Sequence, residues 1–381
     1  MKRKSVLLGS IAVCIMSAGC VDSYDETEDG EIGSAQQAFI SYTWAYAWAQ
    51  QATGSFTASP TYSRNSSGAT NTITQQGTGQ YLVQLQGVGV PGNEPFAGGN
   101  VQVTAYGSGA ERCKPSFWIH IGGDVNVYVN CFTAGGEAVD TRFSVAYVRK
   151  SGTGSSHEAY VRADEATNPA YTPDLRFQFN STGANNTVAR LGAGRYAVTL
   201  PGQTAAGGTV EVTAYGGGSE HCKVASWVQL GDDTVVSVRC FDSAGALSDS
   251  MFDLNFANAS HINGAPSYSY AWADDTTAAA YTPHLSYQKG FILGWGDVAT
   301  DITAGRTSTG RYLVNLPGMS STGSNVQVTA YGSGSEYCKV VSWSGDEANA
   351  NADVACFDAA GAPTDTRFVI VYTDDKNLSI G

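Results

Sequence analysis

One nine-residue segment occurs three times in the chain with almost no change. It reads VQVTAYGSG at residues 101–109, VEVTAYGGG at 210–218 and VQVTAYGSG at 326–334. The spacing of about 110 residues is long enough for each copy to bury a hydrophobic core of its own. It is far longer than the repeats of solenoid proteins, which depend on their neighbours. The repetition therefore predicts three copies of one domain, folded independently like beads on a string.

The stretches between the repeats set the predicted boundaries. Both stretches, KSGTGSS and ASHINGAP, are rich in residues that are typical of linkers and turns. We predict repeats at 42–149, 158–258 and 267–374, linkers at 150–157 and 259–266, and a short tail at 375–381.

Composition and residue pattern favour an all-β fold. Only 14% of the residues are charged, 45 are glycine, and the Leu-, Ala-, Glu- and Lys-rich patterns of long helices are absent. Each repeat contains seven or eight short alternating segments separated by Gly, Ser, Asn and Asp turns. This pattern predicts three tandem antiparallel β-sandwich domains. Their topology is either immunoglobulin-like or jelly-roll-like, and the sequence leaves that choice open.

Alternation within the nine-residue segment separates two faces of a strand. Val101 and Val103 share the face that we expect to pack on the core, and Gln102 and Thr104 share the face that we expect to meet solvent. Tyr106 falls on the polar face, where it either hydrogen-bonds across a sheet end or stacks on a ligand. We interpret the segment as scaffold.

A second shared pattern predicts a hairpin in every repeat. Gly79, Gly194 and Gly310 stand just before a Tyr-x-Val-x-Leu strand, where a hairpin turn requires a positive φ angle.

The cysteines repeat with the units. Six of the eight fall into pairs of equal spacing, namely Cys113/Cys131, Cys222/Cys240 and Cys338/Cys356. Because an exported protein meets an oxidising environment, we predict one disulfide within each repeat. The short spacing suits neighbouring strands rather than opposite sheets. No His recurs with the pairs, which disfavours a metal site.

The amino-terminal residues indicate export. Residues 1–19 combine a basic start with an apolar stretch too short to span a bilayer, as in a signal peptide. SAGC at 17–20 resembles the lipobox of bacterial lipoproteins, so we predict lipidation at Cys20; an ordinary signal peptide is the alternative. Residues 20–41 predict an acidic, lipid-anchored tether. We therefore expect an outer-membrane or cell-surface location, held by lipid alone or released.

Charge and motifs argue against several function classes. The formal net charge of −13 disfavours binding to nucleic acid. The five histidines occupy no common repeat position, and neither a Gly-x-Ser-x-Gly nor a His-Glu-x-x-His motif occurs. We expect no catalytic residue and no cofactor.

Three charged positions are kept in every repeat. They are Glu111/Glu220/Glu336, Lys114/Lys223/Lys339 and Asp140/Asp249/Asp365. Two carboxylates could form an acid/base pair, as in glycoside hydrolysis. A surface ion pair between the Lys and one acid, with an Asp-type turn, explains the same residues.

Calcium binding is a hypothesis for the third repeat only. Glu347, Asn349, Asn351 and Asp353 supply oxygen atoms at every second position, but the central Gly and terminal Glu of a calcium loop are missing. The alternative is the polar outer face of a strand.

Positions that differ between the repeats are the candidates for ligand binding. Trp48 and Trp272 align with Arg162, and Phe291 and Trp295 stand in a segment that is polar in the second repeat. Loops on rigid sandwiches commonly carry recognition. Local packing is the alternative for each of these aromatic residues.

The shared motifs resemble one family. G-[RQ]-Y-x-V-x-L, V-T-A-Y-G, E-x-C-K-x-x-x-W and V-x-C-F are similar to those of tandem repeats in secreted or lipid-anchored bacterial β-domain proteins. The resemblance implies no activity. We expect a non-enzymatic lipoprotein with multivalent adhesion, or binding to an extracellular glycan or surface protein. The alternatives are a self-associating envelope or matrix component, and a hydrolase with a site in one repeat.

Overall fold

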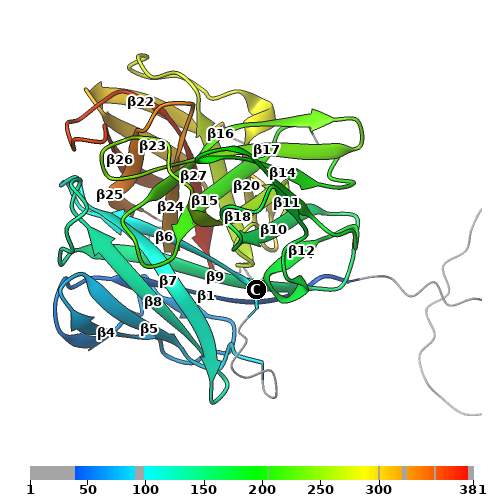
Figure 1. Ribbon diagram of the computed structural model, residues 1–381, viewed down its shortest axis with the longest axis horizontal. Coiled ribbons are helices and arrows are strands. Elements are labelled where there is room, and N and C mark those ends of the chain that lie inside the picture. Colours follow the sequence, from blue (N-terminus) through cyan, green and yellow to red (C-terminus); the bar gives the residue numbers. More distant parts are fainter. Residues whose placement is uncertain are drawn as a thin grey trace, which may run out of the picture. The chain divides into compact units, whose positions relative to one another are not determined.

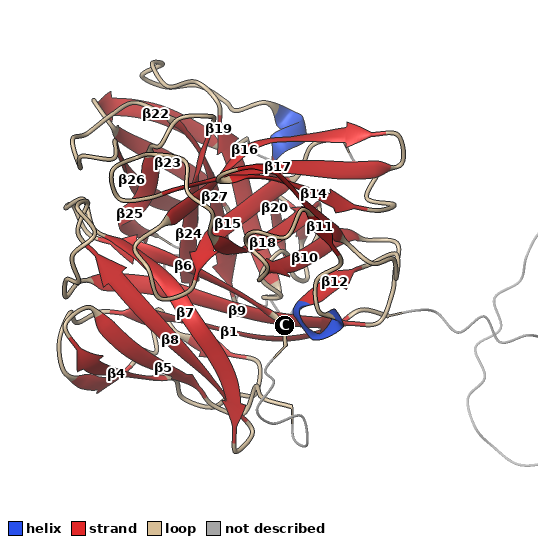
Figure 2. Ribbon diagram, in the orientation of Figure 1, coloured by secondary structure: helices blue, strands red, loops and turns tan. Residues whose placement is uncertain are grey.

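The computed structural model describes residues 39–90, 98–204, 206–298, 301–319, 324–346 and 349–375. The predicted signal peptide and Cys20, and nearly all of the tether, lie outside them. The regular secondary structure of the described chain is β-strand, apart from two short 3-10 turns (Figures 1 and 2). In this part of the chain, no helix is long and apolar enough to cross a membrane. The predicted all-β class is confirmed.

The strands follow the three repeats. Repeat 1 contains β1 (Ser41–Ala49), β2 (Ser55–Thr57), β3 (Arg64–Asn65), β4 (Thr72–Gly77), β5 (Gln80–Leu85), β6 (Asn100–Tyr106), β7 (Arg112–Ile121), β8 (Asp124–Phe132) and β9 (Arg142–Ser151). Repeat 2 contains β10 (His157–Ala163), β11 (Ala170–Tyr171), η1 (Leu175–Phe177), β12 (Gln178–Asn180), β13 (Thr187–Gly192), β14 (Arg195–Leu200), β15 (Thr209–Tyr215), β16 (His221–Leu230), β17 (Asp233–Phe241) and β18 (Met251–Asn258). Repeat 3 contains β19 (Ser267–Ala273), η2 (Leu285–Tyr287), β20 (Gln288–Ile292), β21 (Gly296–Asp297), β22 (Thr303–Ser308), β23 (Arg311–Pro317), β24 (Ser324–Tyr331), β25 (Tyr337–Gly345), β26 (Asn349–Phe357) and β27 (Arg367–Asp374).

Each repeat is a sandwich of two antiparallel sheets. In repeat 1 one sheet has the order β3-β1-β9-β6 and the other β2-β4-β5-β8-β7. Repeat 2 keeps the same plan with β12-β10-β18-β15 and β11-β13-β14-β17-β16, and repeat 3 with β21-β20-β19-β27-β24 and β22-β23-β26-β25. The first strand of each repeat always pairs with the last, so the repeat is closed by its own ends.

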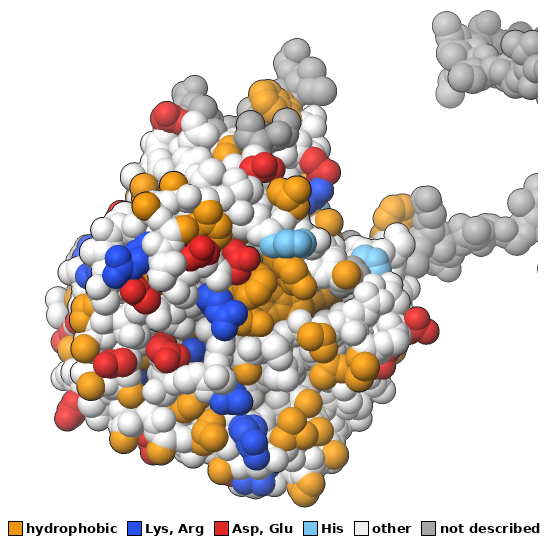
Figure 3. All heavy atoms as spheres, turned by 90° about the horizontal axis from the view of Figure 1, so that it is seen from above, with side chains coloured by type: hydrophobic (Ala, Val, Ile, Leu, Met, Phe, Trp, Pro, Cys, Tyr) orange, Lys and Arg blue, Asp and Glu red, His pale blue; other side chains and the backbone are white. Residues whose placement is uncertain are grey.

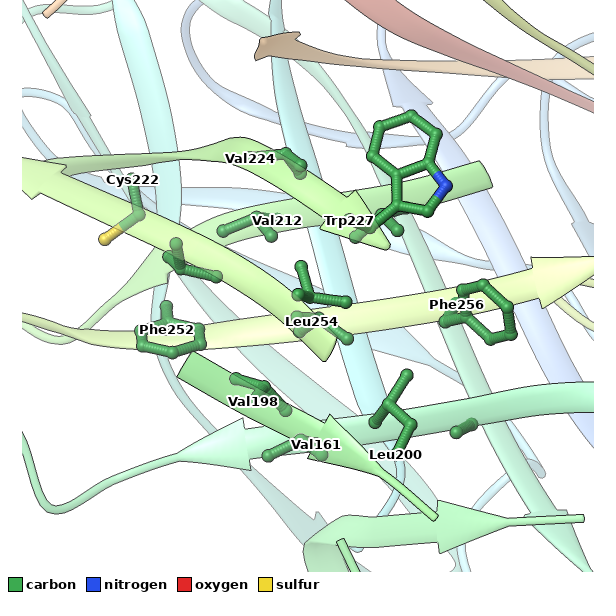
Figure 4. Packing of buried hydrophobic residues seen from close by; sticks show 14 of the residues in the cluster. Val161, Val198, Leu200, Val212, Cys222, Val224, Trp227, Phe252, Leu254 and Phe256 are labelled. Carbon is green, nitrogen blue, oxygen red and sulfur yellow. The ribbon is translucent and has the colours of Figure 1, made fainter. Parts of the chain in front are cut away.

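The apolar residues of the alternating strands fill the space between the two sheets, as predicted. In repeat 2, Val212 and Leu254 of one sheet pack in the same cluster as Val198 and Val224 of the other (Figure 4). Between β4 and β5 the turn places Gly79 at φ 66°, and an added Cβ there would lie 2.6 Å from the carbonyl oxygen of Cys131. The glycine is therefore required both by its φ angle and by the lack of space.

All three predicted disulfides are present. The bonded pairs are Cys113–Cys131, Cys222–Cys240 and Cys338–Cys356, with Cα atoms 4.1, 4.0 and 4.0 Å apart. In each pair the two residues lie directly opposite each other on adjacent strands, β7 and β8, β16 and β17, or β25 and β26. The bridges thus join neighbouring strands of one sheet, as the short spacing indicated.

The disulfides belong to the hydrophobic cores rather than to the surface. The second cysteine of each pair is 0% exposed: Cys131, Cys240 and Cys356. Cys240 packs in the core cluster of repeat 2 and Cys131 in that of repeat 1. The predicted disulfide cysteines therefore have a structural role, since they hold adjacent strands together at the core.

The repeats are not separate beads. The described residues belong to one compact unit, and the same backbone hydrogen bond recurs between each pair of repeats. The three bonds run from Gly216 N to Pro115 O (3.0 Å), from Gly332 N to Val224 O (2.9 Å) and from Gly107 N to Val340 O (2.9 Å). Repeat 1 therefore contacts repeat 2, repeat 2 contacts repeat 3, and repeat 3 contacts repeat 1. The contacts close a ring.

The polar face of the repeated segment lies inside this ring rather than in solvent. Gln102 is 2% exposed and Thr104 is 5% exposed, so the expected solvent face was wrong. The threonine hydroxyls accept hydrogen bonds from backbone N–H groups of another repeat. These bonds run from repeat 1 to repeat 2, from repeat 2 to repeat 3 and from repeat 3 to repeat 1. The bonds run from Val103 N to Thr213 (3.3 Å), from Val212 N to Thr329 (3.1 Å) and from Val328 N to Thr104 (3.1 Å). Hydrogen bonding between copies explains why the segment tolerates so little change.

Candidate binding groove and the predicted site residues

Trp48 and Trp272 lie in aromatic clusters between repeats. Trp48 contacts Trp343 of repeat 3 with the ring centroids 5.8 Å apart, and Tyr106 at 5.1 Å. Trp272 contacts Trp227 of repeat 2 at 5.8 Å and Tyr331 at 4.9 Å. Edge-on and tilted contacts of this kind stabilise packing. These two residues and Tyr106 therefore contribute to the joints of the ring.

Arg162 fills the equivalent place in the joint between repeats 1 and 2. Its guanidinium carbon lies 3.3 Å from the centroid of Phe177 and 5.3 Å from the centroids of Trp118 and Tyr215. Asp164 forms an ion pair with it at 3.2 Å. A cation over aromatic faces replaces the tryptophan of the other two joints.

Phe291 and Trp295 have different surroundings. Phe291, on β20, stacks on Tyr268 at 5.5 Å and meets the edge of His261 at 5.7 Å. Trp295 lies between β20 and β21 and is 72% exposed. Leu293, two residues before it, lines a groove, so the exposed Trp295 belongs to the loop at the border of that groove.

The groove combines segments that are far apart in the sequence. It has a volume of about 640 Å³ and is lined by Tyr42 and Trp44 of β1, Arg64 of β3, His261, Leu293 and Asp375, among others. Repeat 1, the 259–266 linker and repeat 3 thus all contribute to it. The volume falls in the range of ordinary ligand pockets.

Aromatic and neutral polar groups dominate the groove. Tyr46 stacks on Trp44 at 5.6 Å, which fixes the indole that lines it. Burial lowers the pKa of His261, and its Nδ1 lies 3.0 Å from the carbonyl oxygen of Ala265. This imidazole is therefore neutral at neutral pH, with its proton on Nδ1. Arg64 and Asp375 supply one ion pair.

Tyr42 connects the groove to the interior. Its hydroxyl donates to Oε1 of Glu158 at 2.6 Å. Burial, and then the Glu158 carboxylate, raise the pKa of Tyr42, so the phenol stays protonated. The groove therefore offers aromatic surfaces and hydrogen-bonding groups for binding.

The repeated charged residues act in the scaffold. Each Lys pairs with the Glu of the next repeat: Lys114 with Glu220, Lys223 with Glu336, and Lys339 with Glu111, at 3.1, 2.9 and 2.7 Å. The lysine side chains are at most 4% exposed. The expected surface pair within one repeat is thus a largely buried pair between repeats.

The repeated aspartates cap the hairpin turns. Asp140, Asp249 and Asp365 accept the backbone N–H of Gly79, Gly194 and Gly310 at 2.7, 3.0 and 2.8 Å. Asp249 and Asp365 also form ion pairs with Arg190 and Arg306. Their turn role agrees with the second interpretation of these residues.

The calcium candidates lie on β26, apart from Glu347, which is outside the described residues. Asn351 Oδ1 accepts a hydrogen bond from Asn315 Nδ2 at 3.0 Å. Asp353 Oδ2 accepts a hydrogen bond from the Ser342 hydroxyl at 2.7 Å. The strand alternates these polar residues with buried alanines. Among the described residues, no group of three acidic, His or Cys side chains could hold a metal ion.

A second hollow lies where the three repeats meet. It encloses about 60 Å³ and is lined by two of the paired lysines, Lys114 and Lys339, together with Arg112, His221 and Tyr337. Arg112 lies over the ring of Tyr337 at 4.7 Å, and His221 meets the same ring at 5.5 Å. The space suits a few water molecules rather than an organic ligand.

No protein-family model matches the chain, and no match was found among the curated proteins or the solved structures.

Proposed function

We propose that this protein is a non-enzymatic binding lipoprotein of the bacterial surface, anchored at Cys20, and that its groove takes an extracellular saccharide. The observation that carries the proposal is the Tyr42–Trp44–His261 surface of the groove, with the Arg64–Asp375 ion pair beside it. Aromatic faces suit the C–H faces of a sugar ring, and the neighbouring polar groups suit its hydroxyls.

Among the described residues, only repeat 1 supplies a tryptophan at the Trp44 position of its first strand. The positions of β10 and β19 that align with Trp44 hold Glu158 and Tyr268, and Glu158 is fully buried in an ion pair. Multivalent adhesion therefore arises from many anchored chains on one membrane rather than from the three repeats. When one anchored chain has bound, its neighbours on the membrane are held close to the same target. Their effective concentration rises and the overall affinity increases without any new contact.

The test uses the full chain on a glycan array and on whole bacterial cells. Saturable binding is expected, and Trp44→Ala and Asp375→Ala are each expected to weaken it at least tenfold. Phe117→Ala is the matched control, because Phe117 is an exposed aromatic residue (41%) that stacks on Tyr128 outside the groove. Equal losses in all three variants, or no binding to any surface, would contradict the groove as the site.

A self-associating envelope component is the second candidate. Val228, Leu230 and Leu285 are 55%, 69% and 65% exposed. Separately, Figure 3 shows hydrophobic side chains that gather beside a histidine on one face of the molecule. Exposed apolar patches mark interaction surfaces. Oligomers that grow with concentration in sedimentation, and that Leu230→Glu abolishes, would favour this role.

A further inference from the structure

Lys150 and Glu158 form a fully buried ion pair at the junction of repeats 1 and 2. Lys150 lies near the end of β9, Glu158 lies on β10, and both side chains are 0% exposed. The Lys150 Nζ and the Glu158 Oε2 atoms are 2.7 Å apart. Every other ion pair among the described residues has at least one partner that is 22% exposed or more.

The two oxygens of Glu158 have different surroundings. Oε1 accepts hydrogen bonds from the hydroxyl groups of Tyr42 (2.6 Å), Ser156 (2.8 Å) and Ser260 (3.1 Å). Oε2 and Nζ of Lys150 are in contact, yet neither has a hydrogen bond of normal geometry among the described residues. The carboxyl group is therefore held through Oε1, while Oε2 is left facing the amine.

This arrangement is absent from the other junctions. The residues that align with Glu158 are Trp44 and Tyr268. The pair is thus no part of the repeated scaffold. A buried ion pair is also costly, because two charges must leave water. A neutral group in the same place would avoid that cost.

We propose that Lys150 and Glu158 condense into an intramolecular amide bond, which closes residues 150–158 into a covalent loop at the junction of repeats 1 and 2. The ion pair is the starting state. The ammonium passes one proton to Oε2, and the lone pair of Nζ attacks Cδ. Nζ then gives up a second proton as the Cδ–Oε2 bond breaks, and Oε2 departs as water. One Nζ–Cδ bond forms and one water molecule leaves, with no oxidant or other reactant.

The surroundings favour this step. The three hydroxyls on Oε1 lie where negative charge develops in the tetrahedral intermediate, as donors do in an oxyanion hole. The packed strands hold the amine and the carboxyl in contact, which replaces a bimolecular encounter.

Peptide mass spectrometry of the full chain tests the proposal. The protein is denatured, reduced, alkylated and digested with trypsin. An amide at Lys150 blocks cleavage there, so the expected product is the peptide 150–162, lighter than its sequence by the mass of one water. Its fragment ions should lack breaks between residues 150 and 158, because that segment is a closed loop.

Two controls make the result decisive. Lys150→Arg retains the charge but has no amine to condense, so its peptide 151–162 should have the unmodified mass. Lys223 pairs with the partly exposed Glu336 at 2.9 Å and should be cleaved normally. Complete cleavage after Lys150 in the wild-type protein, with an unmodified peptide 151–162, would overturn the proposal and leave a buried ion pair.

Discussion

Lys339 of the third repeat donates to Glu111 of the first at 2.7 Å, and this contact closes a ring that the chain order alone would leave open. The lysine side chain is 1% exposed and the glutamate side chain 29%. The equivalent pair Lys114–Glu220 joins repeats 1 and 2, and Lys223–Glu336 joins repeats 2 and 3. The first and last units of the chain are therefore connected as directly as consecutive ones.

Glu111→Gln should destabilise the protein, because it leaves the Lys339 ammonium buried without its opposite charge. The expected loss in free energy of unfolding is about 1–3 kcal/mol, measured by urea denaturation. Asp174→Asn is the control, since Asp174 pairs with Arg176 at the surface; its effect should stay below about 0.5 kcal/mol. Equal effects of the two variants would contradict a structural role for the ring of ion pairs.

Trp343→Ala should be far more damaging than Trp295→Ala. Trp343 is 7% exposed and contacts Trp48, Tyr62 and Tyr106 of repeat 1, so truncation opens a cavity in the joint. We expect a loss of about 3–5 kcal/mol for Trp343→Ala. Trp295 is 72% exposed, and its removal should change stability by less than about 0.5 kcal/mol. Thermal unfolding of both variants gives the comparison.

Gly310→Ala should separate the lack of space from the strain of a positive φ angle. Gly310 and Gly122 have φ angles of 63° and 61°. A Cβ at Gly310 would lie 2.5 Å from the Cys356 carbonyl oxygen, whereas a Cβ at Gly122 would meet nothing within 4 Å. Gly122→Ala should cost about 1 kcal/mol, and Gly310→Ala about 3 kcal/mol or more, by urea denaturation. Similar costs would show that backbone strain alone decides both.

Glu211→Gln should remove a pH dependence of stability. Glu211 is 1% exposed, and burial raises its pKa from 4.5 to about 8. The folded state therefore binds a proton that the unfolded state has lost, so stability falls as pH rises from about 4.5 to about 8. Gln102 and Gln327 occupy the same position in the other repeats, so Gln fits the site.

The expected gain for Glu211→Gln is a few kcal/mol at pH 8 and little at pH 4, from denaturation curves at both values. Gln102→Glu is the reciprocal variant and should introduce a similar fall in stability with pH. Parallel pH profiles for wild type and Glu211→Gln would contradict the assignment.

The sequence could not predict the groove, because its parts have no local pattern in common. Tyr42 and Trp44 open the first strand, while His261 stands in a stretch that is typical of a linker. The position of Trp48 and Trp272 holds Arg162 in the second repeat, and such variation is typical of binding residues. Here the variation has a packing explanation, because Arg162 fills the joint between repeats 1 and 2 as tryptophan fills the other two. Variation between copies does not distinguish the two.

The sequence alone determined the repeats, the disulfide pairs, the hairpin glycines and the apolar face of each strand, because each depends on spacing and period-two alternation within a short segment. Only the tertiary structure decided where the other face lies. Gln102 and Thr104 are as polar as surface residues, and hydrogen bonds with other repeats satisfy them as water does. A polar strand face has the same sequence pattern whether it meets water or another repeat. The sequence therefore cannot distinguish three separate domains from one closed ring, and only the contacts between repeats in the folded structure do so.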